Sequence, residues 1–156
     1  MNYCPFCKSD LILKEIDGEE RLACNSPSCE FVFWNNPIPV VAGIVEVDNK
    51  IVLAHNRAWP QDWMSIITGF LEKGETPEEG IARETKEELN LDAGPCTLVG
   101  VYSFHRMNQV IIAYHVPATG TVTLNEELDR YKLVTKEELE PWDSATGYAV
   151  RDYLDR

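Results

Sequence analysis

Four of the five cysteines in this 156-residue chain lie within its first 29 residues, in two closely spaced pairs. The first pair is Cys4 and Cys7 in "CPFC", and the second is Cys24 and Cys29 in "CNSPSC". Each pair is close enough to sit on one tight turn, and four thiolates complete a tetrahedral zinc shell that has no open position. The spacing therefore predicts a structural zinc site and not a catalytic one.

The segment around these cysteines is too short to fold by burying apolar surface alone. Residues 11–24 read as two short strands around an Asp-Gly turn, so we expect a zinc ribbon over residues 1–35 that depends on its metal for stability. Two disulfides are the alternative interpretation. No basic and apolar leader opens the sequence, which favours residence in the cytoplasm, where disulfides rarely persist.

Residues 36–156 read as a second domain of mixed strands and helices. Segments rich in β-branched residues flank an Asp-Asn turn, which predicts a hairpin of residues 38–47 and 50–56. Further strands are expected at 64–68, 96–104, 109–116 and 130–134. Helices are expected to begin at Pro77 and near Ser144. This order of elements predicts an α/β sandwich around a mixed sheet.

The central helix has a clear start signal. Thr76 and Glu79 match a capping box, and Pro77 occupies the first helical position. At about 100° per residue, one arc of this helix is expected to face the core; its members are Ile81, Ala82, Thr85 and Leu89.

Glu84, Glu87 and Glu88 fall together on the adjacent arc of this helix, although like charges one turn apart repel. A solvated acidic face is the alternative, but such faces usually contain lysines at four-residue spacing, and no cation shares this arc. Three carboxylates without a cation among them suit hard divalent ions such as Mg²⁺ or Mn²⁺. Gly80, on the same arc, indicates that a ligand or a loop approaches the helix backbone.

The segment "GFLEKGETPEEGIARETKEELNL", residues 69–91, resembles the Nudix box. The defining positions of that pattern fall on Gly69, Glu75, Arg83, Glu84, Glu87 and Glu88. Thr85 stands where the family has a more apolar residue, and Asn90 replaces a glycine that ends the helix in a left-handed conformation, which asparagine also tolerates. With its four-cysteine ribbon, the chain resembles zinc-ribbon Nudix hydrolases related to NADH pyrophosphatase, some of which act on FAD or ADP-ribose. The NADH pyrophosphatase signature after the box is missing, because that region reads "VYSFHRMNQ".

This resemblance implies a Nudix α/β/α sandwich with a mixed sheet, preceded by the ribbon. It implies metal-dependent hydrolysis of a nucleoside diphosphate linked to another moiety, such as FAD, NAD(H) or ADP-ribose, to two monophosphates. It assigns Mg²⁺ or Mn²⁺ to the carbonyl of Gly69 and to Glu84, Glu87 and Glu88. It also gives Arg83 and Glu75 the role of holding those carboxylates. For the general base, Glu127 in "NEELDRY" is the preferred candidate and Glu126 the other.

Aromatic faces and cations are needed to bind a nucleotide. The available aromatic residues are Trp59, Trp63, Phe70, Tyr102 and Phe104, and Arg57 and Arg106 could reach phosphates. We predict substrate contacts from Arg57, Phe70 and Tyr102. The three histidines show no ligand spacing and are expected to be structural.

The formal net charge of −12 argues against nucleic acid as a partner, since nucleic-acid binding draws on clustered lysine and arginine. It also means that a phosphate ligand is repelled unless cations intervene. No apolar run is long enough to cross a bilayer. The expected partner is a small nucleotide. Dimers are common among the relatives that the chain resembles, so the resemblance also implies a homodimer. The alternatives are a nucleoside triphosphate pyrophosphohydrolase and a non-catalytic module that senses a nucleotide.

Overall fold

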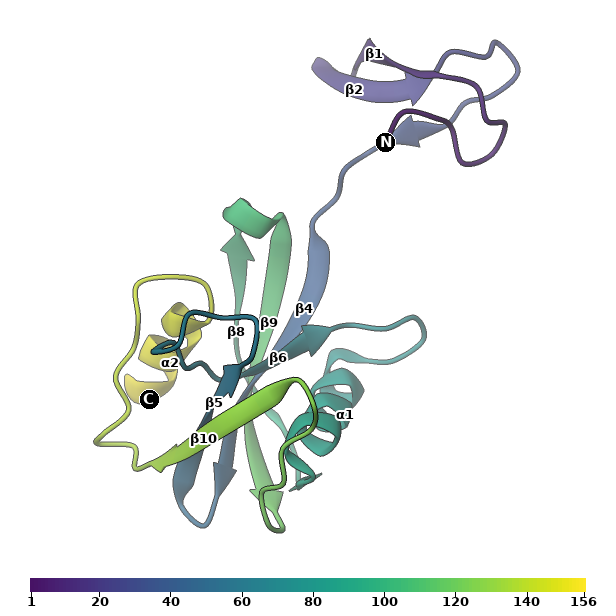
Figure 1. Ribbon diagram of the computed structural model, residues 1–156. Coiled ribbons are helices and arrows are strands. Elements are labelled where there is room, and N and C mark those ends of the chain that lie inside the picture. The colour runs from purple at the N-terminus through teal and green to yellow at the C-terminus, as the bar shows by residue number, and fades with distance from the viewer. The chain divides into compact units, whose positions relative to one another are not determined.

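The computed structural model describes residues 1–156, and the chain divides into two units (Figure 1). The first unit, residues 1–36, holds a three-stranded antiparallel sheet. Its strands are β1 (Leu11–Ile16), β2 (Glu19–Cys24) and β3 (Val32–Phe33). Asp17 and Gly18 between β1 and β2 both have positive φ, 55° and 81°, which suits a tight hairpin turn. The two predicted strands are confirmed, and β3 is an addition too short to be visible in the sequence pattern.

The second unit, residues 37–156, is built on a seven-stranded sheet in the order β10-β5-β4-β9-β7, with β6 beside β4 and β8 beside β9. The strands are β4 (Ile38–Val47), β5 (Lys50–Asn56), β6 (Ile67–Phe70), β7 (Asp92–Ala93), β8 (Thr97–Phe104), β9 (Gln109–Thr119) and β10 (Leu128–Val134). The helices are α1 (Pro77–Leu89) and α2 (Thr146–Leu154), with a 3-10 turn at His105–Met107. Because β4 and β9 are parallel and β4 and β5 antiparallel, the predicted mixed sheet is confirmed.

The strand predicted at residues 64–68 lies later than expected. The regular strand β6 spans Ile67–Phe70, and Ser65 forms only an isolated bridge with Ala54. The segment changes partner between these points, since Ser65 pairs with β5 whereas β6 pairs with residues 40–43 of β4. A continuous apolar run does not reveal such a change of partner.

Two apolar clusters pack on opposite faces of the sheet, and β4 contributes alternate residues to both. Ala42 and Ile44 face the cluster that includes Ala149 and Val150 of α2, whereas Val41 faces the cluster that includes α1. The sheet therefore lies between two helices, as Figure 1 shows, and the predicted α/β/α sandwich is confirmed.

Helix α1 packs very close to the sheet at one point. A Cβ atom at Gly43 of β4 would lie 2.8 Å from Cδ1 of the fully buried Ile81, so a larger residue would require Ile81 to shift within the packed core. Thr85 and Leu89 are also fully buried, as predicted. Ala82 is only half-buried, and Glu88 takes the more buried place, with 8% of its surface exposed. The buried hydroxyl of Thr85 has a hydrogen-bond partner within the helix, since it donates to the carbonyl of Ile81 at 2.7 Å.

Candidate active site

Helix α1 holds the glutamate cluster between two defined ends. The Thr76 hydroxyl accepts a hydrogen bond from Glu79 N at 3.3 Å, and Glu79 Oε2 accepts one from Thr76 N at 2.7 Å. This reciprocal pair confirms the predicted capping box and start at Pro77. At the other end Asn90 adopts the left-handed conformation, with φ 57° and ψ 25°, as its place in the box predicts.

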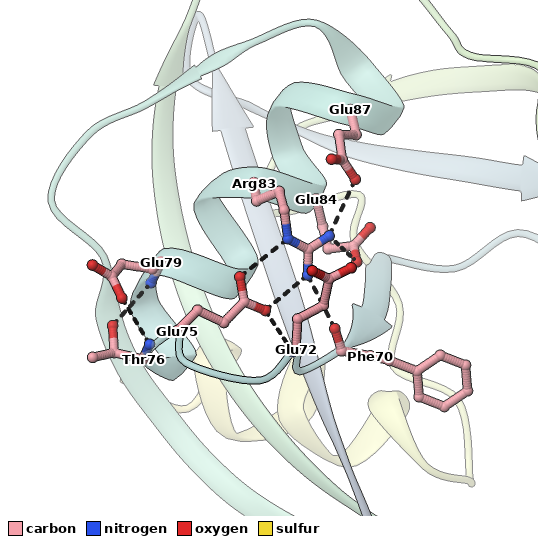
Figure 2. Close-up of polar contacts among 8 residues, drawn as sticks. All are labelled: Phe70, Glu72, Glu75, Thr76, Glu79, Arg83, Glu84 and Glu87. Carbon is pink, nitrogen blue, oxygen red and sulfur yellow. Dashed lines mark hydrogen bonds and ion pairs between the residues drawn. The ribbon is translucent and has the colours of Figure 1, made fainter.

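Arg83 forms hydrogen bonds with three glutamates and one backbone carbonyl (Figure 2). Its Nε and Nη2 donate to the two oxygens of Glu75 at 3.1 and 2.8 Å, in a bidentate pair. Its Nη1 donates to Glu84 at 2.7 Å and to Glu87 at 3.1 Å, and its Nη2 also donates to the Phe70 carbonyl at 3.1 Å. The hydrogen bonds from Arg83 lower the pKa of Glu75 and raise that of Arg83 itself.

The expectation that no cation lies among the three glutamates is therefore wrong. A helical projection places Arg83 off the acidic arc, but its long side chain reaches back to two members of the cluster. Arg83 nevertheless leaves Glu88 without a partner, because its donors are directed to Glu75, Glu84, Glu87 and the Phe70 carbonyl.

Two glycines allow other groups to approach α1. A Cβ atom at Gly80 would lie 2.9 Å from Glu75 Oε1 and 3.1 Å from Leu71 Cδ1, so the residue makes room for the loop before the helix. At Gly69 a Cβ atom would lie only 1.9 Å from Glu84 Oε1. The Glu84 carboxylate thus packs directly on the backbone of Gly69, which places that backbone beside the acidic cluster.

Glu88 is the most buried of the acidic side chains, and no hydrogen-bond donor contacts its carboxylate. Burial, followed by the charges of Glu84, Glu127 and Glu87, raises its pKa to about 8. Burial also raises the pKa of Glu84, although Arg83 opposes the shift. Glu88 is thus a buried carboxylate without a donor beside the partly buried Glu84 and the exposed Glu87, and a hard cation with oxygen ligands would stabilise such a group.

Glu127 lies beside this cluster because the loop before β10 is fastened to the end of α1. Thr123 N donates to Leu89 O at 2.9 Å, and Asn125 N donates to Glu88 O at 3.3 Å. The Asn125 side chain accepts from Glu127 N at 3.0 Å, and the Glu127 carbonyl accepts from Arg57 N at 2.9 Å. Glu88 and Glu127 line the same small pocket of 70 Å³. Sequence reasoning missed Asn125, although an asparagine two residues before the candidate base is the signature of an Asx turn.

A larger cavity of 590 Å³ adjoins this pocket, since Trp59 and Thr68 line both. Its wall is mainly aromatic and apolar and includes Trp59, Trp63, Phe104, Met107 and Trp142, with Arg106 as the one cationic residue. Trp59, Trp63 and Phe104 were among the aromatic candidates read from the sequence. Trp142 was not, because it comes from the segment before α2, remote in sequence from the box.

The three predicted substrate contacts lie elsewhere. Tyr102 is half-buried and donates its hydroxyl to Asp152 of α2 at 2.8 Å, and burial raises its pKa to about 12. Phe70 is exposed beside Gly69, and Arg57 is exposed in the loop after β5. None of the three lines the large cavity, and their contact with substrate stays a prediction.

The four cysteines of the first unit converge. Their sulfur atoms all lie within 4.8 Å of one another. The Cys4–Cys29 and Cys7–Cys24 sulfur pairs are 3.7 and 3.4 Å apart, far longer than the roughly 2.05 Å of a disulfide bond. This donor set fits a tetrahedral thiolate site for one metal ion.

None of the helices in the structure has both the length and the apolar character needed to cross a membrane.

The structure thus has a mixed sheet between two helices and a glutamate cluster on α1, where Arg83 joins Glu75, Glu84 and Glu87. Residues 37–153 match the family model of the NUDIX domain. The chain therefore belongs to the NUDIX family, and the resemblance of residues 69–91 to the Nudix box is confirmed.

Among solved structures, a NUDIX hydrolase from Nitrosomonas europaea is 27% identical with a TM-score of 0.83, over 99% of this chain and 91% of that one. An NAD-capped RNA hydrolase, NudC, of Vibrio atlanticus is 29% identical over 120 residues, or 77% of this chain and 43% of that protein. An ADP-ribose pyrophosphatase of Methanocaldococcus jannaschii is 44% identical over 75 residues, or 47% of this chain and 44% of that protein. The chain thus spans less than half the length of these two curated relatives.

Proposed function

We propose that this chain hydrolyses the pyrophosphate bond of a nucleoside diphosphate linked to a second moiety, with a divalent metal ion, and releases two monophosphates. One observation supports this most strongly: Trp59 and Thr68 line both the small pocket that contains Glu88 and Glu127 and the large, mainly apolar cavity. This adjacency supports a ligand that has its nucleoside in the cavity and its phosphates towards the carboxylates. The relatives named for ADP-ribose and for NAD-capped RNA agree with a substrate of this shape.

The residues that would hold the divalent ion are Glu84, Glu87, Glu88 and the carbonyl of Gly69. The structure supports this choice because Glu88 is buried without a donor and Glu84 packs on Gly69. When bound, Mg²⁺ or Mn²⁺ would activate water and offset charge on the phosphate oxygens. With a net charge of −12, the chain cannot attract a pyrophosphate through its own field.

The chain's own groups then position the reaction. Arg83 holds Glu84 and Glu87 in place, and Glu75 orients Arg83 from its other side. We propose that Glu127 accepts the proton of the attacking water as it adds to one phosphorus, while the bridging P–O bond breaks and each product keeps one phosphate. The hydrogen bonds that join the loop of Thr123 and Asn125 to α1 support this role, because they hold the backbone of Glu127 near the end of the helix.

We also propose that the four cysteines bind one Zn²⁺ with a structural role. Four thiolates fill a tetrahedral shell and leave no position for substrate.

A substrate panel tests the proposed activity. FAD, NADH, ADP-ribose and a nucleoside triphosphate are incubated with Mg²⁺ or Mn²⁺, and the products are identified by mass. We expect two monophosphates from at least one of the first three compounds and no reaction with EDTA. Release of pyrophosphate from the triphosphate alone would support the pyrophosphohydrolase alternative, and no cleavage of any compound would support the sensing module.

Two neighbouring glutamates offer a matched pair for the role of the base. Glu127→Gln is expected to lower kcat by about two to four orders of magnitude, whereas Glu126→Gln, one residue earlier, should leave it nearly unchanged. Equal losses in the two variants would argue against Glu127 as the proton acceptor.

A further inference from the structure

The loop between β5 and β6, residues 57–66, forms part of the wall of the large cavity through Trp59 and Trp63. Within the loop, two turns are closed by backbone bonds of 2.9 Å, from Trp59 N to Asn56 O and from Trp63 N to Pro60 O. Such turns define the local shape of a loop but not its position against a sheet. Other contacts must hold the two tryptophans beside the cavity.

Two side chains from the sheet bind consecutive carbonyls of this loop. His55 of β5 contacts Pro60 O through Nε2 at 3.2 Å, and Arg130 of β10 donates to Gln61 O through Nη2. Both also turn towards Asp129 of β10: His55 Nδ1 lies 2.6 Å from its carboxylate and Arg130 Nε lies 3.8 Å from it. These three residues are called the Asp129 cluster below.

His55 joins Asp129 to the loop, because its two ring nitrogens contact different elements of the chain. The shorter contact, 2.6 Å, is with the carboxylate of Asp129, and the contact of 3.2 Å is with the Pro60 carbonyl. His55 is 4% exposed, so the bridge lies inside the protein. The hydrogen bond from His55 holds the pKa of Asp129 below its usual range.

We propose that Asp129 is a positioning residue for substrate binding. It acts through His55 and Arg130 to hold the loop of residues 57–66, with Trp59 and Trp63, against the cavity. Asp129 contacts His55 Nδ1 and Arg130 Nε, and these two side chains contact the carbonyls of Pro60 and Gln61 in the loop. This inference rests on the proposed function only where it concerns substrate; the restraint on the loop is independent of it. Asp129 does not line the cavity, and its side chain contacts the two residues that contact the loop.

Asp129→Asn tests this role because it preserves the shape of the side chain and removes the charge. The variant replaces the carboxylate contacts with His55 and Arg130 by neutral ones, which weakens the support of the two side chains that contact the loop. We expect KM for the best substrate of the panel to rise about tenfold, with kcat within about twofold of wild type. Amide hydrogen exchange of residues 58–64 should become faster in the same variant without substrate.

Asp92→Asn is the matched control. Asp92 also accepts from one cation, Lys86 Nζ at 2.8 Å, but both groups are exposed and neither lines the cavity. It should change neither KM nor exchange in the loop. Arg130→Gln removes the bond to Gln61 and the longer contact with Asp129 but leaves His55 in place. It should shift KM and exchange in the same direction as Asp129→Asn by a smaller factor, which keeps the test valid if Asp129→Asn does not fold.

Unchanged exchange of residues 58–64 in the folded Asp129 and Arg130 variants would overturn the proposed restraint on the loop. Faster exchange with unchanged KM would overturn its role in substrate binding. If the wild-type chain hydrolyses none of the panel compounds, the proposed function fails by that result alone, and the exchange measurement still decides whether the Asp129 cluster holds the loop.

Discussion

Glu88→Gln is expected to lower hydrolysis by about two to four orders of magnitude and to make the metal-free protein more stable. The activity falls because the variant loses an anionic oxygen that would bind the divalent ion. The stability rises because an ionised carboxylate is costly when it is buried without a donor, as Glu88 is. Thermal unfolding in EDTA and a kinetic assay with Mg²⁺ measure the two effects on the same preparations.

The stability effect has a defined dependence on pH. Burial and then the neighbouring carboxylates raise the pKa of Glu88 from 4.5 to about 8. Between these values the folded metal-free protein holds a proton that the unfolded chain releases. The free energy of unfolding of the wild type therefore falls as pH rises through this window. The advantage of Glu88→Gln should be small near about pH 5 and largest near about pH 8.

Glu137→Gln serves as the control for both measurements, since Glu137 is exposed and lies outside the site. It should change neither activity nor the pH dependence of unfolding. If Glu88→Gln retained full activity, or if it destabilised the metal-free protein at about pH 8, the role given to Glu88 would be wrong.

Removal of the ribbon metal is expected to unfold residues 1–36. The unit has little buried apolar surface, and structural zinc supplies about 10–16 kcal/mol of apparent binding free energy in comparable small sites. Cys4→Ser should therefore reduce zinc content from one ion per chain to almost none. Amides of β1 and β2 should then exchange at the rates of an unfolded chain, while the core of residues 37–156 stays protected.

Cys96→Ser is the matched control, because Cys96 lies in the second unit and outside the cysteine cluster. It should keep one zinc per chain, measured by elemental analysis. A full zinc content in Cys4→Ser, or protected β1 and β2 amides after zinc is removed, would contradict a structural thiolate site.

Much of the fold could be predicted because its signals are local. The capping box at Thr76, the left-handed Asn90 and the alternating apolar residues of β4 each act within a few residues of the chain. The change of partner before β6 could not be predicted, because it depends on which strand lies beside Ser65 after folding. The same holds for Trp142, which reaches the cavity only through the tertiary fold.

In the candidate site, too, local features could be predicted and features that depend on the tertiary fold could not. The spacing of Glu84, Glu87 and Glu88 on a helix predicts their shared arc, whereas the reach of the Arg83 side chain back into the cluster depends on rotamers that a projection ignores. The hydrogen bond from the Tyr102 hydroxyl to Asp152 on α2 also could not be predicted, because the two residues are 50 positions apart in the sequence. The histidines were expected to be structural, and the role of His55 emerges only when both of its contacts are known.

Anomalous diffraction from crystals soaked with Mn²⁺ and a non-hydrolysable dinucleotide analogue is the most direct measurement of whether the α1 glutamates hold divalent cations against a pyrophosphate. We expect manganese peaks between the phosphate oxygens and the carboxylates of Glu84 and Glu88, with the nucleoside in the cavity beside Trp59. A bound nucleotide whose phosphates lie away from α1, or a glutamate cluster without manganese, would contradict the proposed chemistry.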